Sequence, residues 1–300
     1  MTSRITLAIP NRDNCRYLSQ CLDSVKSQVL RAAEVIISDN HSRDASLKVV
    51  EKYKSLFDNV LRPPRSLSYY EHLRWILEHS SGEYVIFLAG DDIAHPELIK
   101  EYDKILGRVD EKPAFVCSPF YRLDDKSRII GGWKWTNNLE GVRPQSIRIF
   151  EKGPICNISS VAWQKDQLEK IPDLPINCRN CVDWFWYMYL SSRYPVAFVP
   201  KPLLFYRVHN NSTGNSDVAA HTLQCKEMLK WVLNNKMIPD INPLVCKNHI
   251  SDFDKIITSK NRDGALLIFK NIGRRLLRLH PRVRAGQEVL DNLALVEKSR

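Results

Sequence analysis

The chain has 300 residues, enough for one large domain or for one domain with an appendage, and its hydrophobic content of 44% can fill a sizeable core. No stretch approaches the roughly 18 uncharged apolar residues of a membrane span, and residues 1–4 lead directly into a strand-like run without a signal-peptide pattern, so we expect a cytosolic protein. The net charge of +10 is compatible with nucleic acid, anionic lipid or a phosphate-bearing substrate.

The first 120 residues alternate between expected strands and expected helices. Short apolar runs predict strands at 5–9, 35–37, 84–89 and 114–117. Apolar residues at helical spacing predict helices at 17–28, from Ser46, around 73–77 and at 96–106. This alternation indicates an α/β fold in which helices flank both faces of a mostly parallel sheet.

Polar residues follow three of these strands at the point where each strand ends. The residues concerned are Pro10, Asn11, Arg12 and Asp13 after the first strand, Asp39 and Asn40 after the second, and Asp91 and Asp92 after the run that begins at Tyr84. Each segment alone is ordinary turn chemistry. Three of them on the carboxyl edge of one sheet favour a shared binding site, because ligands bind there in open α/β folds. Paired carboxylates can hold a hard divalent cation, which in turn can hold phosphate.

Several nucleotide-binding and hydrolase motifs are absent from the sequence. No GxGxxG follows the first strand, which argues against a dinucleotide site, and no GxxxxGK[ST] marks a P-loop. The GxSxG nucleophile elbow of α/β-hydrolases is also missing.

The three polar segments together resemble family 2 glycosyltransferases of the GT-A fold. In that family a Pro-Thr-Tyr-Asn-Arg-like turn and a Tyr-Leu helix follow the first strand; here residues 9–14 read IPNRDN and Tyr17-Leu18 follow. The second strand of the family ends in Asp-Asp/Asn-x-Ser-x-Asp-Gly-Thr, and residues 39–46 read DNHSRDAS. The metal-binding strand begins Gly-Glu-Tyr, as do residues 82–92, GEYVIFLAGDD. The resemblance covers about residues 4–217.

The resemblance implies roles for these residues. Asp39 would accept from the donor's base. We expect a UDP-sugar, although a carboxylate accepts equally from uracil or thymine N3–H and from guanine N1–H. Pro10 to Asp13 and Asn40 would contact the donor. Asp91 would hold Mg²⁺ or Mn²⁺ on the donor diphosphate, and Asp92 would support the metal or contact the sugar. The first aspartate of the family's Asp-x-Asp pattern is Ala89 here, so looser metal binding is an open alternative.

The second half of the chain contributes three further candidates. Asp183 lies in a dense aromatic run, where an acid at a helix start is one interpretation. Family 2 enzymes often carry an x-Asp-Trp motif whose aspartate is the general base, so the resemblance implies an inverting displacement in which Asp183 takes the proton of the acceptor hydroxyl. Residues 206–209 resemble the family's Tyr-Arg-x-His ending, in which Arg207 would contact the diphosphate and His209 the metal; a structural role for either residue is the alternative.

Eight cysteines are scattered along the chain, and only Cys178 and Cys181 have CxxC spacing. A structural zinc site needs a second pair of ligands, and no other CxxC and no HxxxH accompanies them. Reduced thiols are therefore the expectation in a cytosolic protein.

The chain is expected to have three parts: a donor-binding half over 1–120, an acceptor-binding half over 121–217, and a helical basic region over 218–300. Between 262 and 284, seven Lys/Arg and one acid alternate with Leu, Ile and Phe. A basic amphipathic helix of this kind can lie on anionic lipid or can pack on the catalytic domain with a solvated basic face. Binding of nucleic acid is not expected, because no recognised motif accompanies the charge.

The sequence thus predicts a metal-dependent, inverting glycosyltransferase that moves a sugar from a nucleotide-sugar to a saccharide or lipid-linked saccharide in surface glycan biosynthesis. Two rivals remain. A nucleotidyltransferase would carry a Gly-rich, Arg-bearing loop after the first strand, where this chain has residues 10–13. A degenerate sugar-nucleotide-binding module would need no residue in the role of Asp183.

Overall fold

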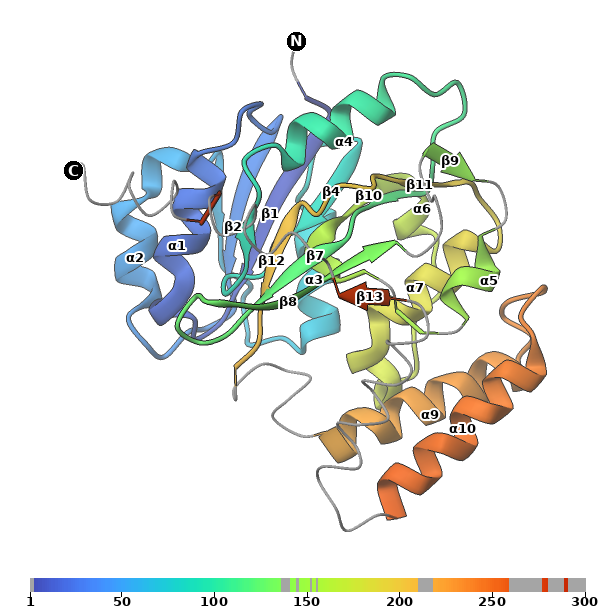
Figure 1. The fold of residues 1–300 in the computed structure, drawn as a ribbon. Coiled ribbons are helices and arrows are strands. Elements are labelled where there is room, and N and C mark those ends of the chain that lie inside the picture. The colour runs from blue at the N-terminus through green and yellow to red at the C-terminus, as the bar shows by residue number, and fades with distance from the viewer. Residues whose placement is uncertain are drawn as a thin grey trace.

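The structure is a computed structural model and describes residues 3–135, 141–143, 146–151, 153–154, 156–209, 218–258, 277–279 and 289–290. An eight-stranded sheet forms its centre, in the order β3-β2-β1-β4-β10-β6-β11-β9 (Figure 1). Its strands are β1 Ile5–Asn11, β2 Glu34–Asp39, β3 Asn59–Leu61, β4 Tyr84–Phe87, β6 Phe115–Cys117, β9 Gly141–Arg143, β10 Val161–Gln164 and β11 Val196–Phe198. Strands from 1–120 and from 121–217 share this sheet, so the two expected halves are parts of one layer.

The first four strands in this order run parallel, as the alternation of strands and helices predicts. β1 pairs with β2 on one side and with β4 on the other, and Asn11 lies opposite Asp39 in the register. β10 is antiparallel to both β4 and β6, and β9 is antiparallel to β11. The sheet is therefore mostly parallel on the side that carries the polar strand ends.

Helices cover both faces of the sheet. The helices are α1 Cys15–Lys26, α2 Ser46–Lys52, α3 Tyr69–Glu78, α4 Leu98–Leu106, α5 Ile147–Phe150, α6 Lys165–Glu169, α7 Val182–Ser191, α9 Val218–Asn234 and α10 Pro243–Thr258, with 3₁₀ turns η1 Lys54–Leu56, η2 Ile158–Ser160 and η3 Ile176–Cys181. Buried side chains of α1 and α4 pack on one face, and those of α3 and α7 pack on the other. Burial of this apolar surface is the main force that holds the layers together.

A second, smaller sheet crosses the carboxyl edge of the first. Its order is β13-β8-β7-β12-β5, with β5 Ile93–Ala94, β7 Phe120–Leu123, β8 Ile129–Trp135, β12 Leu204–Arg207 and β13 Leu277–Leu279. β12 pairs antiparallel with β5, which directly follows Asp91 and Asp92. This pairing brings the end of β12 to the carboxyl edge of β4.

The C-terminal region forms the helices α9 and α10 but is not helical at 277–279. α9 and α10 lie side by side beyond α7, at the lower right of Figure 1. The basic segment 262–284 lies outside the described residues except for Leu277–Leu279. Those three residues form β13 and pair antiparallel with β8, so the expected helix is wrong at this point; a Leu-Arg-Leu alternation has the period of a strand.

No helix within the described ranges is long and apolar enough to cross a membrane.

Candidate active site

A cavity of about 960 Å³ opens at the carboxyl edge of β1, β2 and β4. Seven of the residues predicted from the sequence line it: Pro10, Asn11, Arg12, Asp13, Asn40, Asp91 and His209. Asp39, Asp92, Asp183 and Arg207 are not among the described residues that form its wall. The cavity is large enough for a nucleotide-sugar-sized ligand, since small-molecule sites span roughly 300–1,000 Å³.

The ends of β1 and β2 are tied together by side-chain hydrogen bonds. Asn11 donates from Nδ2 to Asp39 Oδ1 over 3.0 Å, and the Ser42 hydroxyl donates to the same oxygen over 2.5 Å. The Ser42 backbone N–H donates to Asp39 Oδ2 over 3.1 Å. Asp39 is 2% exposed. A carboxylate offers about four lone pairs, so Asp39 keeps one acceptor site, on Oδ2, after these three bonds.

Asn40 fixes the loop that precedes α3. Its side chain donates from Nδ2 to the Leu67 carbonyl over 2.8 Å and accepts from the Leu67 N–H at Oδ1 over 2.9 Å. Ser68 then caps α3 in a capping box with Glu71. Tyr69, the first residue of α3, is thereby held on the cavity wall.

The sequence did not predict the part of the cavity wall that is formed by α3 and the loop before it. Leu67, Tyr69 and His72 all line the cavity. The S-x-x-E signature of the capping box was readable at residues 68–71 and places a helix start directly after the loop. The acids Asp124 and Asp125, in the β7–β8 turn, also line the cavity; no local pattern marked them.

Asp91 and His209 form a close pair on the cavity wall. Asp91 Oδ2 lies 2.9 Å from His209 Nε2, and their side chains are 17% and 11% exposed. Two adjacent ligands of an octahedral ion, each at 2.0–2.1 Å, stand about 2.9 Å apart. The contact is a hydrogen bond as it stands, and the same spacing would let the carboxylate and the imidazole act as two neighbouring ligands of a divalent cation in place of the shared proton.

Asp92 and Arg207 lie beneath the cavity rather than in it. Asp92 is 1% exposed and accepts from the Arg207 backbone N–H over 2.9 Å. Arg207 is fully buried, and its guanidinium donates to the Asp91 and Asp124 carbonyls, the Ser127 hydroxyl and the Gln20 side chain. This geometry does not favour the expected contact of Arg207 with a diphosphate, because the guanidinium already donates its hydrogen bonds to loops of the protein itself.

Asp183 lies in the first turn of α7 and is partly buried. Burial raises the pKa of its carboxyl, although Oδ1 accepts from the Trp184 N–H over 2.8 Å. Tyr69, on the cavity wall, is half-buried, and burial together with the charges of Asp183, Asp91 and Asp92 raises the pKa of its hydroxyl. The charges of all three acids therefore act on the Tyr69 hydroxyl, although Asp183 itself is not among the described residues that line the cavity.

Comparisons with known proteins identify the family of this chain. The model of the family described as glycosyl transferase family 2 matches residues 6–162. An uncharacterized glycosyltransferase of Rickettsia typhi is 23% identical over 227 residues, which are 71% of this chain and 66% of the relative, so this chain spans just under two thirds of that relative's length.

Two solved structures share the fold. TarS of S. aureus, in complex with UDP-GlcNAc, superposes with a TM-score of 0.59 at 15% identity, over 88% of this chain and 74% of TarS. The mannosyltransferase PcManGT of Pyrobaculum calidifontis, in complex with GDP-Man and Mn²⁺, gives 0.59 at 14% identity, over 98% of this chain and 86% of PcManGT. Because the family model spans more than half of the 300 residues and contains the strand ends that build the cavity, the chain belongs to glycosyl transferase family 2.

Proposed function

We propose that this protein is a metal-dependent, inverting glycosyltransferase that moves a sugar from a nucleotide-sugar to a saccharide or lipid-linked saccharide in surface glycan biosynthesis. The observation that carries the proposal is the Asp91–His209 pair, which faces a cavity lined by Asn11, Arg12 and Asp13. A cation held there would lie where the diphosphate of a donor fits. Membrane contact through 262–284 remains a prediction.

The base of the donor would lie at the ends of β1 and β2. Asp39 keeps an acceptor site on Oδ2 after its three internal bonds, and Asn11 and Ser42 hold its carboxylate in one orientation. An N–H of uracil or guanine can donate to such a site. TarS is solved with UDP-GlcNAc and PcManGT with GDP-Man, so the fold accommodates both bases. We favour a UDP-sugar.

The cation would be Mn²⁺ or Mg²⁺, and the donor set favours Mn²⁺. Mg²⁺ prefers oxygen ligands, whereas His209 offers a nitrogen beside the carboxylate of Asp91. A bound divalent cation neutralises the charge that develops on the leaving nucleoside diphosphate. Ala89, in the place of the family's first aspartate, lies on the cavity wall and offers no side-chain ligand, so affinity depends on two protein ligands.

Asp183 would act as the general base. Its carboxylate would take the proton of the acceptor hydroxyl while that oxygen bonds to the anomeric carbon and the bond to the diphosphate breaks, which inverts the configuration. A raised pKa, caused by burial, makes the carboxylate a stronger proton acceptor.

A ligand panel tests the donor and metal assignments. Thermal unfolding of the protein is followed with UDP, GDP, dTDP and CMP, each with Mn²⁺ and with EDTA. We expect one nucleoside diphosphate, UDP first, to raise the melting temperature with Mn²⁺ and to lose the effect in EDTA, because Asp91 would hold the cation that the diphosphate needs for binding.

Two variants sharpen the panel. Asp91→Asn should remove the Mn²⁺-dependent shift, whereas Asp125→Asn should keep it, because Asp125 is an acid of the same cavity that pairs with Arg16 on the surface. An unchanged response in Asp91→Asn would overturn the metal assignment. A metal-dependent ligand response without any sugar transfer to acceptor or water would favour the degenerate binding module.

A further inference from the structure

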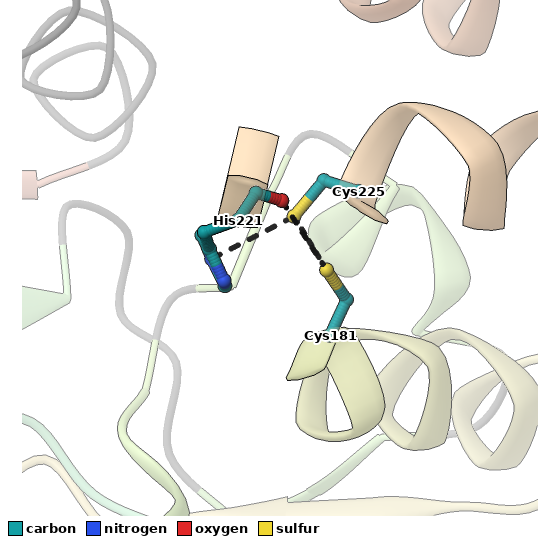
Figure 2. Close-up of side chains that lie close together, drawn as sticks. All are labelled: Cys181, His221 and Cys225. Carbon is teal, nitrogen blue, oxygen red and sulfur yellow. Dashed lines mark hydrogen bonds between the residues drawn. The ribbon is translucent and has the colours of Figure 1, made fainter. Parts of the chain in front are cut away.

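Two cysteines and a histidine meet outside the cavity, where the start of α9 lies against the start of α7. Cys181 is the residue before α7, and His221 and Cys225 lie one turn apart on one face of α9. Figure 2 shows the three side chains pointing toward one another. Cys181 Sγ is 2.7 Å from Cys225 Sγ, His221 Nε2 is 3.7 Å from Cys225 Sγ, and one ligand atom from each residue lies within 4.8 Å of the others.

The distance between Cys225 and His221 suits a shared metal ion as it stands, whereas the two sulfurs are closer than two ligands of one ion. In a tetrahedral zinc site, with Zn–S of about 2.3 Å and Zn–N of about 2.0–2.1 Å, a sulfur and a nitrogen ligand stand about 3.6 Å apart. The observed separation between Cys225 and His221 is 3.7 Å. Two sulfur ligands need about 3.8 Å, so the two Sγ atoms would separate by small side-chain rotations.

The sequence contains a second pair of ligands that a search for CxxC or HxxxH overlooks. Cys178 and Cys181 form the CxxC pair on η3, and His221 and Cys225 form an HxxxC pair on α9. Side chains three residues apart eclipse on a 3₁₀ turn, so Cys178 lies on the same side of η3 as Cys181. Cys178 is 1% exposed, but its thiol is not among the three ligand groups that lie within 4.8 Å of one another. It would have to move toward them to bind the same ion.

We propose that Cys181, His221 and Cys225 bind a structural zinc ion and that Cys178 completes the tetrahedron. Thiolate and imidazole ligands select zinc over Mg²⁺ or Mn²⁺. The ligand set therefore differs in kind from the Asp91–His209 pair, which combines a hard carboxylate with one imidazole.

The site would fasten α9 to the residue before α7. Asp183 follows Cys181 by two residues, so the ion would fix the first turn of the helix that carries the proposed base. Beyond this turn the two helices already pack through Phe185 and Trp231, whose rings stand 5.6 Å apart in a T-shaped contact. The zinc assignment stands on the cluster alone; its effect on catalysis rests on the proposed function.

The first test measures metal content. The full chain is purified without chelator, with a reductant, and its zinc is quantified by plasma mass spectrometry. We expect about one zinc per chain, as in other closed sites of this ligand type. Cys181→Ser, Cys225→Ser and His221→Gln should each lower the zinc content at least about tenfold, because each removes a ligand. Cys178→Ser should lower it as well, and unchanged content in that variant would overturn the assignment of the fourth ligand.

Two control variants show whether the zinc is bound at this cluster. Cys246→Ser replaces a buried cysteine on α10 and should keep the zinc, and Asp91→Asn should keep it too, so failure of the proposed function does not affect this readout. Purification of a chain without zinc would overturn the proposal. The proposal would also fail if the chain purified without reductant carried a Cys181–Cys225 disulfide, seen in its intact mass, and bound no zinc after reduction.

A second measurement uses the wild-type chain, so its result holds even if the variants do not fold. Co²⁺ added to the metal-free wild-type chain should give the visible bands of a tetrahedral ion and a near-ultraviolet band from thiolate-to-cobalt charge transfer. Zn²⁺ should abolish both, and Mn²⁺ should not. A cobalt spectrum without thiolate charge transfer would overturn the ligand set.

Discussion

Asp183 differs from an ordinary acid at the start of a helix. Aspartate is common in first turns because it interacts favourably with the helix dipole and is usually solvated. Here burial raises the pKa of the carboxyl, and the charge of the carboxylate reaches Tyr69 on the cavity wall. A structural role and a catalytic role make different predictions for its removal.

Asp183→Asn should leave the binding of nucleoside diphosphate unchanged and lower the rate of sugar transfer by about 10²–10⁴-fold, because the amide cannot take up the acceptor proton. The rate is measured under saturating donor and acceptor. The matched control is Asp166→Asn, which replaces an exposed acid in the first turn of α6 and should transfer sugar at the wild-type rate. Equal rates in wild type and Asp183→Asn would show that Asp183 is only a helix-start residue.

The sequence identified many of the individual side chains and left others out for a physical reason. Asn11 and Asp39 are the last residues of β1 and β2, and Asp91 comes four residues after β4, so local pattern alone places them at the sheet edge. Tyr69 and Asp124 reach the cavity through the packing of a loop and a turn, which no short pattern encodes. The pair of His221 and Cys225 was visible as HxxxC spacing, but only the structure shows that it faces Cys181.

Arg207 joins several elements at the base of the cavity. From β12 its guanidinium reaches α1 at Gln20, the turn after β4 at the Asp91 carbonyl, and the β7–β8 turn at Ser127. Its guanidinium also lies over the Tyr17 ring, 4.5 Å from the ring centre. A buried charge held by this many acceptors fixes the backbone that presents Asp91.

Arg207→Met should lower the free energy of unfolding by about 3–5 kcal/mol, because it leaves the four partly buried acceptors of the guanidinium without their donor. Urea unfolding measures the change. Arg128→Met is the control: its bond to Asp124 is a surface ion pair, with the arginine side chain 72% exposed, and such pairs contribute about 0–1 kcal/mol. Equal losses in both variants would contradict the anchoring role.

Among the elements, parallel strands were easier to predict than their antiparallel neighbours. β1, β2 and β4 are continuous apolar runs because helices cover both of their faces. β10 is buried as completely, yet its direction in the sheet depends on the path of the chain between β6 and β10. β12 reaches the site by pairing with the two-residue strand β5, a contact set by tertiary packing.

The stability of the whole molecule should depend on pH through two buried histidines. Burial lowers the pKa of both His72 and His95 from 6.5 to about 4. Between pH 6.5 and 4 the unfolded chain binds protons that the folded chain does not, so the free energy of unfolding falls as the pH falls through this range. Below about pH 4 these two groups add no further loss.

Each histidine should contribute about 2–3 kcal/mol to the difference in unfolding free energy between pH 7 and pH 4.5. Urea unfolding at the two pH values measures it. His72→Gln and His95→Gln should each reduce the difference, whatever they do to stability at pH 7. His79→Gln, at the exposed end of α3, is the control and should leave the difference unchanged. If His72→Gln and His95→Gln both kept the same difference between the two pH values as the wild type, the role of the two histidines would be refuted.

The antiparallel strand β10 also sets an order for synthesis and folding. β4 pairs with β1 on one side and with β10 on the other. As the chain leaves the ribosome, the parallel side of the sheet is complete at β4, but the second edge of β4 has no partner until residues 161–164 appear. For more than 70 residues of synthesis that buried, apolar edge is open to pairing with another chain, and such edges favour aggregation. The chain should therefore depend on chaperones most in the interval between β4 and β10.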